Sequence, residues 1–260
     1  MDFDVSTALP LALYLELDAG LNTEQLEECL FLVESFIARR AFTRDETKEY
    51  NKFFVEIIGS LRGLSGDQVK PALIKKLLSG GGTTRQWPSN EAVLDKAISR
   101  SAYYAIATPA LRLIFERLEL AQRTKKSESS DLPQGLQIEH IMPEKWSQHW
   151  PLQGKTIPAD VMAYPHLAKD DLADLAEPIR SRNLHLQTLG NLTLLNKYLN
   201  PAASNGPFTT KLIEYKHSVL RLNRYFDALT TWDEAAINDR SKILGELLCA
   251  IWPRPGANEQ

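Results

Sequence analysis

The first half of the chain places its apolar residues at helical spacing. In QLEECLFLVESFIARR, residues 25–40, an apolar residue returns every three or four positions, and charged residues occupy the opposite side. This spacing predicts an amphipathic helix, for which Thr23 is the expected N-cap. Three further segments repeat the pattern: 51–61, 69–78 and 107–120. The sequence therefore predicts all-α structure up to residue 122.

The pattern changes beyond this point. Residues 123–135 are polar and have no periodic apolar face, so we interpret them as a linker. Residues 136–142 and 185–195 have short strand-like patterns, and residues 161–176 between them have a helical one. His185 would then lie on the second strand, where it either has a structural role or lines a site. The fold class that follows is mainly α, with a small sheet in the second half.

Composition narrows the class of protein. Among 260 residues, 43% are hydrophobic and 24% are charged, which is typical of a globular protein with a core. Cys29 and Cys249 lack disulfide or metal-site spacing and are interpreted as reduced residues of a cytoplasmic protein. The apolar run at residues 9–15 is much shorter than the ~18 residues that a membrane span needs. The amino-terminal residues have no signal-peptide pattern, so no membrane association is expected.

Positive charge is concentrated in one segment. The net charge of the chain is −3, yet residues 178–226 contain seven Lys or Arg and a single acidic residue, Glu214. Such a segment is either a solvated helix face or a surface that binds phosphates, where cations gain affinity by releasing counterions. Composition leaves both interpretations open.

The sequence QIEHIMP, residues 137–143, places a carboxylate beside an imidazole between apolar residues. Side chains of a strand alternate between its two faces, so Glu139 and His140 would point in opposite directions. Burying both without partners would cost several kcal/mol. Either the pair lies at a twisted strand end, where both groups reach one ion, or one of the two simply faces solvent.

A second motif gives this pair a context. Asn191 begins the sequence NLTLL, and Asn200 follows nine positions later. An acid–His pair, then Asn-Leu-x-x-Leu, then a further Asn resembles an HNH nuclease, the ββα-metal or His-Me finger. The motifs EHIMP and LGNLTLL are similar to those of the C-terminal nuclease module of the GmrSD-type family. The members of this family are prokaryotic defence proteins related to modification-dependent (type IV) restriction enzymes. Other segments also resemble that module: Asn205, Phe208, Lys211 and residues 34–54, 87–93 and 232–253.

The resemblance implies roles for particular residues. His140 is expected to be the general base, and Asn191 to orient it by hydrogen-bonding the loop that carries it. Glu139 and Asn200 are expected to bind one Mg²⁺ or Mn²⁺ ion, because carboxylate and amide oxygens are hard ligands. Two departures from the family pattern stand out: Glu139 replaces the usual Asp, and an insertion must separate His140 from Asn191.

The basic segment is expected to support the site or bind DNA. Asn205 and Lys211 lie near the motifs, and either helix geometry or phosphate contact would explain them. Phosphate contact is one interpretation of Lys216, Arg221 and Arg224, and a solvated helix face is the other. The implied domains are a helical domain, 1–122; a linker, 123–135; the nuclease finger, 136–215, with a helical insertion near 158–177; and C-terminal helices, 216–260.

The function implied by the resemblance is a metal-dependent DNA endonuclease, the effector module of an anti-phage system that restricts modified DNA. Its expected partners are DNA and an N-terminal nucleotide-dependent sensor domain or subunit outside this chain. Two alternatives remain open. One is a catalytically inactive finger that binds DNA without cutting it. The other is a helical protein-interaction module whose motif match is accidental.

Overall fold

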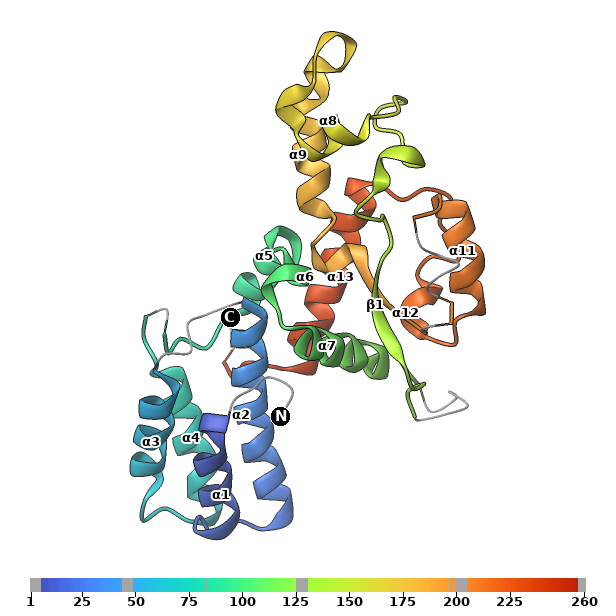
Figure 1. Ribbon diagram of the computed structural model, residues 1–260. Helices are drawn as coiled ribbons and strands as arrows, with labels where there is room; N and C mark the ends of the chain where they lie inside the picture. The colour runs from blue at the N-terminus through green and yellow to red at the C-terminus, as the bar shows by residue number, and fades with distance from the viewer. Residues whose placement is uncertain are drawn as a thin grey trace. The chain divides into compact units, whose positions relative to one another are not determined.

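A computed structural model describes residues 6–43, 49–82, 84–124, 131–196, 198–199 and 205–256. These residues are mainly helical and include one two-stranded sheet, so the predicted mainly α class is confirmed (Figure 1). The chain forms two compact units. We call residues 1–93 with 248–260 the helical unit and residues 94–247 the sheet unit. Part of the predicted linker, residues 125–130, lies outside the described residues, and the predicted domain boundaries stay predictions.

The helical unit packs its amphipathic helices around one core. Phe36, Phe53 and Leu73 are fully or almost fully buried there, and Trp87 closes the core. The predicted helices at 25–40, 51–61 and 69–78 are confirmed. The main helices are α1 (Leu9–Leu17), α2 (Thr23–Thr43), α3 (Tyr50–Leu61) and α4 (Val69–Leu78).

The cap of α2 differs from the prediction by one residue. The Asn22 side-chain Oδ1 accepts the backbone N–H of Gln25 at 2.9 Å, and Gln25 Oε1 accepts the N–H of Asn22 at 3.0 Å. This reciprocal pair satisfies two donors that the first helical turn leaves open. Thr23, predicted as the cap, is instead the first residue of the helix.

Two buried arginines of α2 join this helix to other parts of the helical unit. Arg39 donates to the carbonyl oxygens of Trp252 at 2.5 Å and Pro88 at 3.0 Å. Arg40 donates to Tyr50 Oη at 2.8 Å, with its guanidinium over the Tyr50 ring. These bonds satisfy charged groups that burial would otherwise penalise.

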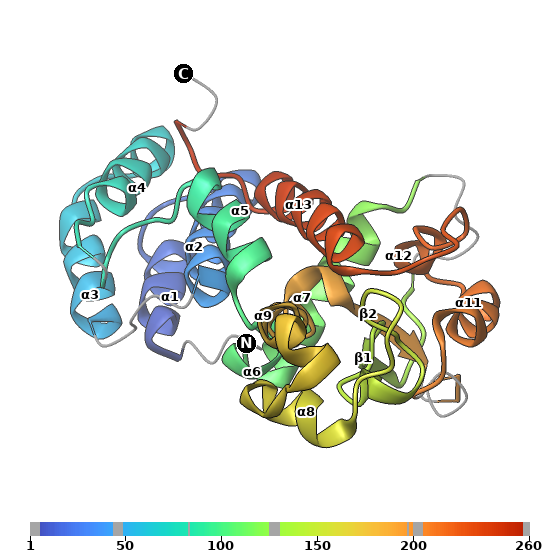
Figure 2. The same ribbon diagram turned by 90° about the horizontal axis from the view of Figure 1, so that it is seen from above.

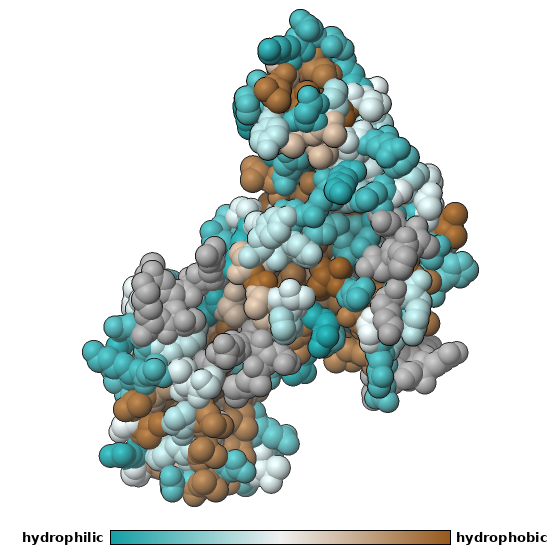
Figure 3. All heavy atoms as spheres, viewed as in Figure 1, coloured by the Kyte–Doolittle hydropathy of each residue, from teal (hydrophilic) through white to brown (hydrophobic). Residues whose placement is uncertain are grey.

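The face of α1 opposite its buried residues is apolar and exposed. Leu9, Leu13 and Leu17 follow one another at helical spacing with 53%, 45% and 73% of their surface exposed. Figure 3 shows brown, apolar surface over this part of the helical unit. Across the described part of the chain, no helix combines the length and the apolar character needed to cross a membrane.

The sheet unit is built around strands β1 (Leu136–His140) and β2 (Leu192–Asn196), which pair antiparallel. Helix α7 (Thr108–Ala121) contacts both strands, and Figure 2 shows it beside them. The register pairs Glu139 with Thr193 and His140 with Leu192. The other helices are α5 (Asn90–Ser99), α6 (Ala102–Ala105), α8 (Ala159–Ala163), α9 (Ala176–His185), α11 (Phe208–His217), α12 (Arg221–Arg224) and α13 (Glu234–Ile251).

The segment between the strands departs from the prediction in two ways. Residues 161–176 do not form one helix, because short α8 is followed by two 3-10 turns before α9 begins. The predicted strand at 185–195 is confirmed only from Leu192 onward. His185 is the last residue of α9, and its Nδ1 lies 2.6 Å from the carbonyl oxygen of Ser181. A short apolar run alone does not distinguish a strand from a buried helical turn.

Candidate active site

Glu139 and His140 end strand β1, and their side chains leave it on opposite faces, as strand geometry requires. Glu139 points toward α11, where it meets Lys211. His140 points toward Gln187 and the Tyr103 ring of α6. The two side chains therefore have separate surroundings within the sheet unit.

Glu139 forms a buried ion pair with Lys211. The Lys211 Nζ donates to Glu139 Oε1 at 2.5 Å and to the carbonyl oxygen of His140 at 2.6 Å. The Lys211 side chain is 0% exposed. Burial raises the pKa of Glu139 and lowers the pKa of Lys211. Of the two roles open for Lys211, this geometry favours holding the end of β1 over contact with a DNA phosphate.

Of the two expected metal ligands, the structure describes only Glu139. Glu139 Oε2 has no hydrogen-bond partner in the described part of the chain, so a hard oxygen donor remains beside the ion pair. Asn200, the second expected ligand, lies outside the described residues. Within the described ranges, no three His, Cys, Asp or Glu side chains cluster as metal ligands would. The donor chemistry of Glu139 fits a divalent cation, and the pairing with Asn200 stays a prediction.

His140 has one engaged ring nitrogen. Its Nε2 lies 3.0 Å from Gln187 Oε1, and the Tyr103 ring meets the imidazole edge-on at a centroid distance of 4.4 Å. Nδ1 has no hydrogen-bond partner among the residues that the structure describes. Burial lowers the pKa of His140, against a smaller opposing effect of the Gln187 hydrogen bond. A neutral imidazole with a lone pair on Nδ1 is equipped to accept a proton.

Gln187 is itself held by two further residues that sequence reasoning missed. Its Nε2 donates to Glu144 Oε1 at 2.8 Å, and the Tyr104 hydroxyl donates to the same oxygen. The hydrogen bond from Tyr104 lowers the pKa of Glu144, and the same contact raises the pKa of Tyr104 to about 12. No local motif joins these residues, because they meet only through the fold.

Asn191 ties the segment that follows His140 to the second strand. It is fully buried, and its Oδ1 accepts the N–H of Met142 at 2.8 Å and the indole N–H of Trp232 at 3.0 Å. Its Nδ2 donates to the carbonyl oxygens of Met142 and Leu186, each at 2.9 Å. Every donor and acceptor site used here faces protein, so Asn191 acts on His140 only through the backbone. Its part in a reaction stays a prediction.

Helix α13 fixes the residues on either side of Asn191. Arg240 is fully buried, which lowers its pKa to about 10, and it donates to the carbonyl oxygens of Gly190 at 2.7 Å and Leu192 at 2.6 Å. A Cβ at Gly190 would lie 2.0 Å from the carbonyl oxygen of Ile237. Only glycine allows this approach, and Asn191 is positioned by it.

The basic segment divides into buried and exposed residues. Arg182 is buried against Glu234, with Nε 2.5 Å from Oε1, so it is committed to the fold. Exposed members of the expected DNA-binding set are Asn205, Lys216, Arg221 and Arg224. Arg224 also lies 3.7 Å from an oxygen of Asp227. The structure therefore leaves Lys216 and Arg221 as the clearest exposed cations of that set.

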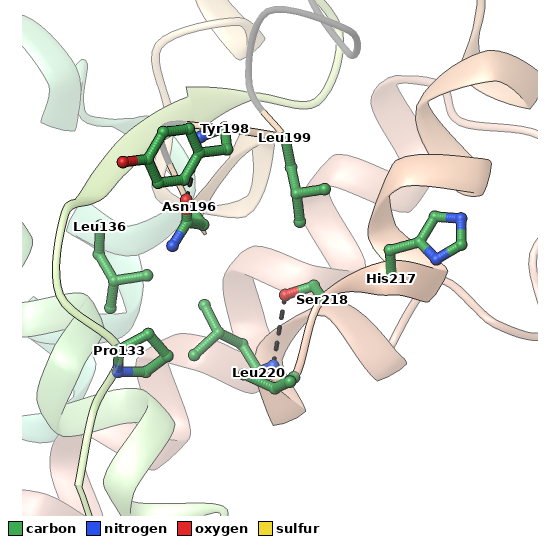
Figure 4. A pocket seen from close by; sticks show the side chains of 9 residues that line it. Pro133, Leu136, Asn196, Tyr198, Leu199, His217, Ser218 and Leu220 are labelled. Atoms are coloured by element: carbon green, nitrogen blue, oxygen red, sulfur yellow. Dashed lines mark hydrogen bonds between the residues drawn. The ribbon is translucent and has the colours of Figure 1, made fainter.

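A pocket lies at the other end of the sheet. It has a volume of about 290 Å³, and Leu136 and Asn196, which pair at the start of β1, line it together with His217 (Figure 4). Figure 4 also shows Ser218 Oγ accepting the backbone N–H of Leu220 at 3.3 Å. Because His140 pairs at the opposite end of the register, this pocket is separate from the candidate base.

Comparison with protein families identifies the chain. The fold and the site define a mainly helical protein in which a two-stranded sheet ends in a histidine, His140, that is hydrogen-bonded to Gln187. The family model for the C-terminal domain of GmrSD restriction endonucleases matches residues 87–247, more than half of the chain. The chain belongs to this family, and the resemblance stated from the motifs is confirmed. No curated protein matches it. Membership in a restriction endonuclease family implies a nuclease role and a DNA substrate.

Proposed function

We propose that this chain is a metal-dependent DNA endonuclease of the HNH type, in which β1, β2 and α11 form the ββα-metal finger. The proposal is carried by the geometry at the end of β1. There Nδ1 of His140 has no partner among the described residues, and Lys211 and Asn191 hold the backbone at and after His140. Family membership supports the nuclease role independently of this geometry.

In the proposed reaction, His140 removes a proton from the water that attacks the phosphodiester bond. Its lowered pKa, caused by burial, keeps the imidazole neutral near pH 7, as a base must be. Lys211 and Asn191 do not touch substrate. They hold the backbone on both sides of the imidazole, because general-base catalysis needs the nitrogen within hydrogen-bond reach of the water.

Glu139 and Asn200 would hold one Mg²⁺ or Mn²⁺ ion. When bound, such an ion stabilises negative charge on the phosphate and on the departing oxygen. Glu139 suits this role because Lys211 occupies only one of its two oxygens. The buried ammonium also prevents an uncompensated carboxylate in the interior before an ion arrives.

DNA would lie along exposed cations of α11 and α12. Lys216 and Arg221 are exposed, and Arg224 adds a third cation next to Asp227. Asn205 is exposed as well and precedes α11. Contacts of this kind neutralise phosphates without reading bases, so they would position DNA rather than select its sequence.

We further propose that the chain is the effector module of an anti-phage system in the cytoplasm. An N-terminal nucleotide-dependent domain or subunit would supply the recognition of modified DNA. The family's description as restriction endonucleases supports the setting. The described structure favours neither an inactive DNA-binding finger nor a protein-interaction module over a nuclease, and the experiment below separates the three.

The test is nicking of supercoiled plasmid in Mg²⁺ or Mn²⁺, with EDTA as the metal-free control. Wild type should nick, and His140→Ala should bind the same DNA but leave it intact. His149→Ala is the matched control, because His149 is exposed and outside the site, and it should nick as wild type does. DNA binding without nicking by wild type would indicate an inactive finger. Absence of both, with no salt-dependent affinity, would indicate a protein-interaction module.

A further inference from the structure

We propose that Gln187 is a positioning residue that fixes the tautomer of His140, and that Glu144 and Tyr104 fix Gln187 in turn. The inference rests on the proposed function, because it assigns Nδ1 of His140 as the nitrogen that takes the proton. It adds to that function three residues that no motif of the chain contains.

The chain of hydrogen bonds has a direction, and Glu144 sets it. An ionised carboxylate only accepts hydrogen bonds. Its Oε1 receives two donors, the Tyr104 hydroxyl and the amide group of Gln187 at 2.8 Å. The lowered pKa of Glu144 is consistent with this ionised state. The NH₂ group of Gln187 must therefore face Glu144.

The amide of Gln187 then decides what His140 can do. With its NH₂ group turned to Glu144, Gln187 presents its oxygen to His140 Nε2 at 3.0 Å. An oxygen without a proton accepts only from a protonated nitrogen, so Nε2 carries the hydrogen of the neutral imidazole. The lone pair is consequently on Nδ1, which has no partner among the described residues. In the other tautomer, Nε2 and the amide oxygen would face each other as two acceptors.

Contacts around the imidazole ring of His140 hold it in the orientation that this tautomer requires. The Tyr103 ring lies against the imidazole at 4.4 Å between centroids and limits its rotation. Gln187 is buried, while Glu144 is exposed and Tyr104 is 69% exposed. Exposed hydrogen bonds contribute little to stability. A purely structural role would not need a series of polar side chains, from Tyr104 through Glu144 to Gln187, that ends on His140 Nε2.

The tautomer is directly measurable. Long-range ¹H–¹⁵N spectra of the full chain labelled at histidine nitrogen distinguish a protonated from an unprotonated ring nitrogen. The chain has five histidines, and the His140→Ala spectrum identifies the signals of His140. At a pH where His140 is neutral, wild type should have its hydrogen on Nε2. In Gln187→Met, which keeps length but removes the acceptor, the signals should shift toward a mixture of tautomers.

A cleavage measurement adds the functional consequence. Under single-turnover conditions with the plasmid of the preceding test, Gln187→Met should lower the rate constant about tenfold. The DNA concentration for half-maximal rate should stay the same. The double variant Gln187→Glu/Glu144→Gln keeps an acceptor toward His140 and a donor beside it, so it should recover most of the rate. Gln137→Met, at an exposed position of β1, is the control and should change neither reading.

The outcomes separate this inference from the proposed function. Hydrogen on Nδ1 in wild type, or a tautomer that is unchanged in folded Gln187→Met, would overturn the inference whether or not the chain cuts DNA. An Nε2–H tautomer that depends on Gln187 would support it even in a chain that cuts nothing, in which case only the nuclease proposal fails. Thermal unfolding of each variant shows that the spectra compare folded proteins.

Discussion

The two faces of strand β1 differ in how completely their polar groups are satisfied. On one face, Glu139 and Lys211 bury two charges against each other, and the ammonium also binds the carbonyl oxygen of His140. On the other face, His140 has one nitrogen engaged by Gln187 and one without a partner among the described residues. The first face thus fixes the backbone and leaves only one oxygen of Glu139 for the proposed ion, and the second face leaves a nitrogen of His140 available for chemistry.

This difference predicts that the first face governs stability and the second governs activity. A residue whose bonds all face protein contributes by holding the fold. A partly buried residue with one nitrogen unpartnered among the described residues, such as His140, contributes less to folding, and losing it should leave the fold intact. Variants on each face should therefore change different properties, by different amounts.

Lys211→Met should have the largest effect on stability. It leaves Glu139 buried without a counter-charge, and breaking such a pair costs about 3–5 kcal/mol. Urea unfolding followed by circular dichroism measures the loss. Lys216→Met is the control, since Lys216 is exposed on the same helix and should change stability by no more than about 0.5 kcal/mol.

Some outcomes would count against this prediction. Equal midpoints for Lys211→Met and wild type would mean that the ion pair is not formed in solution. If Lys211→Met does not fold, the double variant Glu139→Gln/Lys211→Met decides, because it removes both charges and should recover part of the stability. A double variant less stable than Lys211→Met would contradict the pairing.

Asn191→Ala should cost somewhat less, about 2–3 kcal/mol, because it leaves the Met142 N–H and the Trp232 indole N–H buried without acceptors. Asn205→Ala is the matched control, since Asn205 is exposed. Urea midpoints measure stability. Plasmid nicking, assayed without urea under conditions in which the variant is folded, measures activity. A stable Asn191→Ala would mean that the segment after His140 is held by other contacts.

Neutralising exposed cations should have the smallest effect and leave both faces of β1 untouched. Lys216→Gln and Arg221→Gln should each flatten the dependence of log affinity on log salt by roughly one unit if each contacts one phosphate. Fluorescence anisotropy with labelled duplex DNA across a salt series measures this slope. Slopes identical to wild type in both variants would assign the basic segment to a solvated helix face.

Much of the fold was predictable from apolar spacing, since α2, α3, α4 and α7 each bury one stripe of a long amphipathic pattern. Shorter elements were less predictable. Residues 185–191 continue α9 into a 3-10 turn rather than joining the strand. There Leu186 and Leu189 are buried three positions apart, a spacing that suits a helical turn. The segment has no regular alternation of apolar and polar residues that would distinguish a strand from a turn.

The candidate site was predictable only where motifs are local. Glu139, His140 and Asn191 stand in short local motifs, and the family match spans all three residues. The partners of His140 were not predictable, because Gln187 lies 47 residues from it and contacts it only after folding. The role of Lys211 was equally unpredictable, because the sequence of a basic segment does not show which of its charged side chains are buried.

In the proposed reaction His140 is the general base, and the residues around it hold it in place. The most direct measurement is the plasmid-nicking rate constant of His140→Ala in Mg²⁺, taken with its urea midpoint and its DNA affinity. We predict a rate lower by about a hundredfold or more, affinity near that of wild type, and stability within about 1 kcal/mol of it. A folded His140→Ala that nicks as fast as wild type would contradict the account and move the active site away from β1.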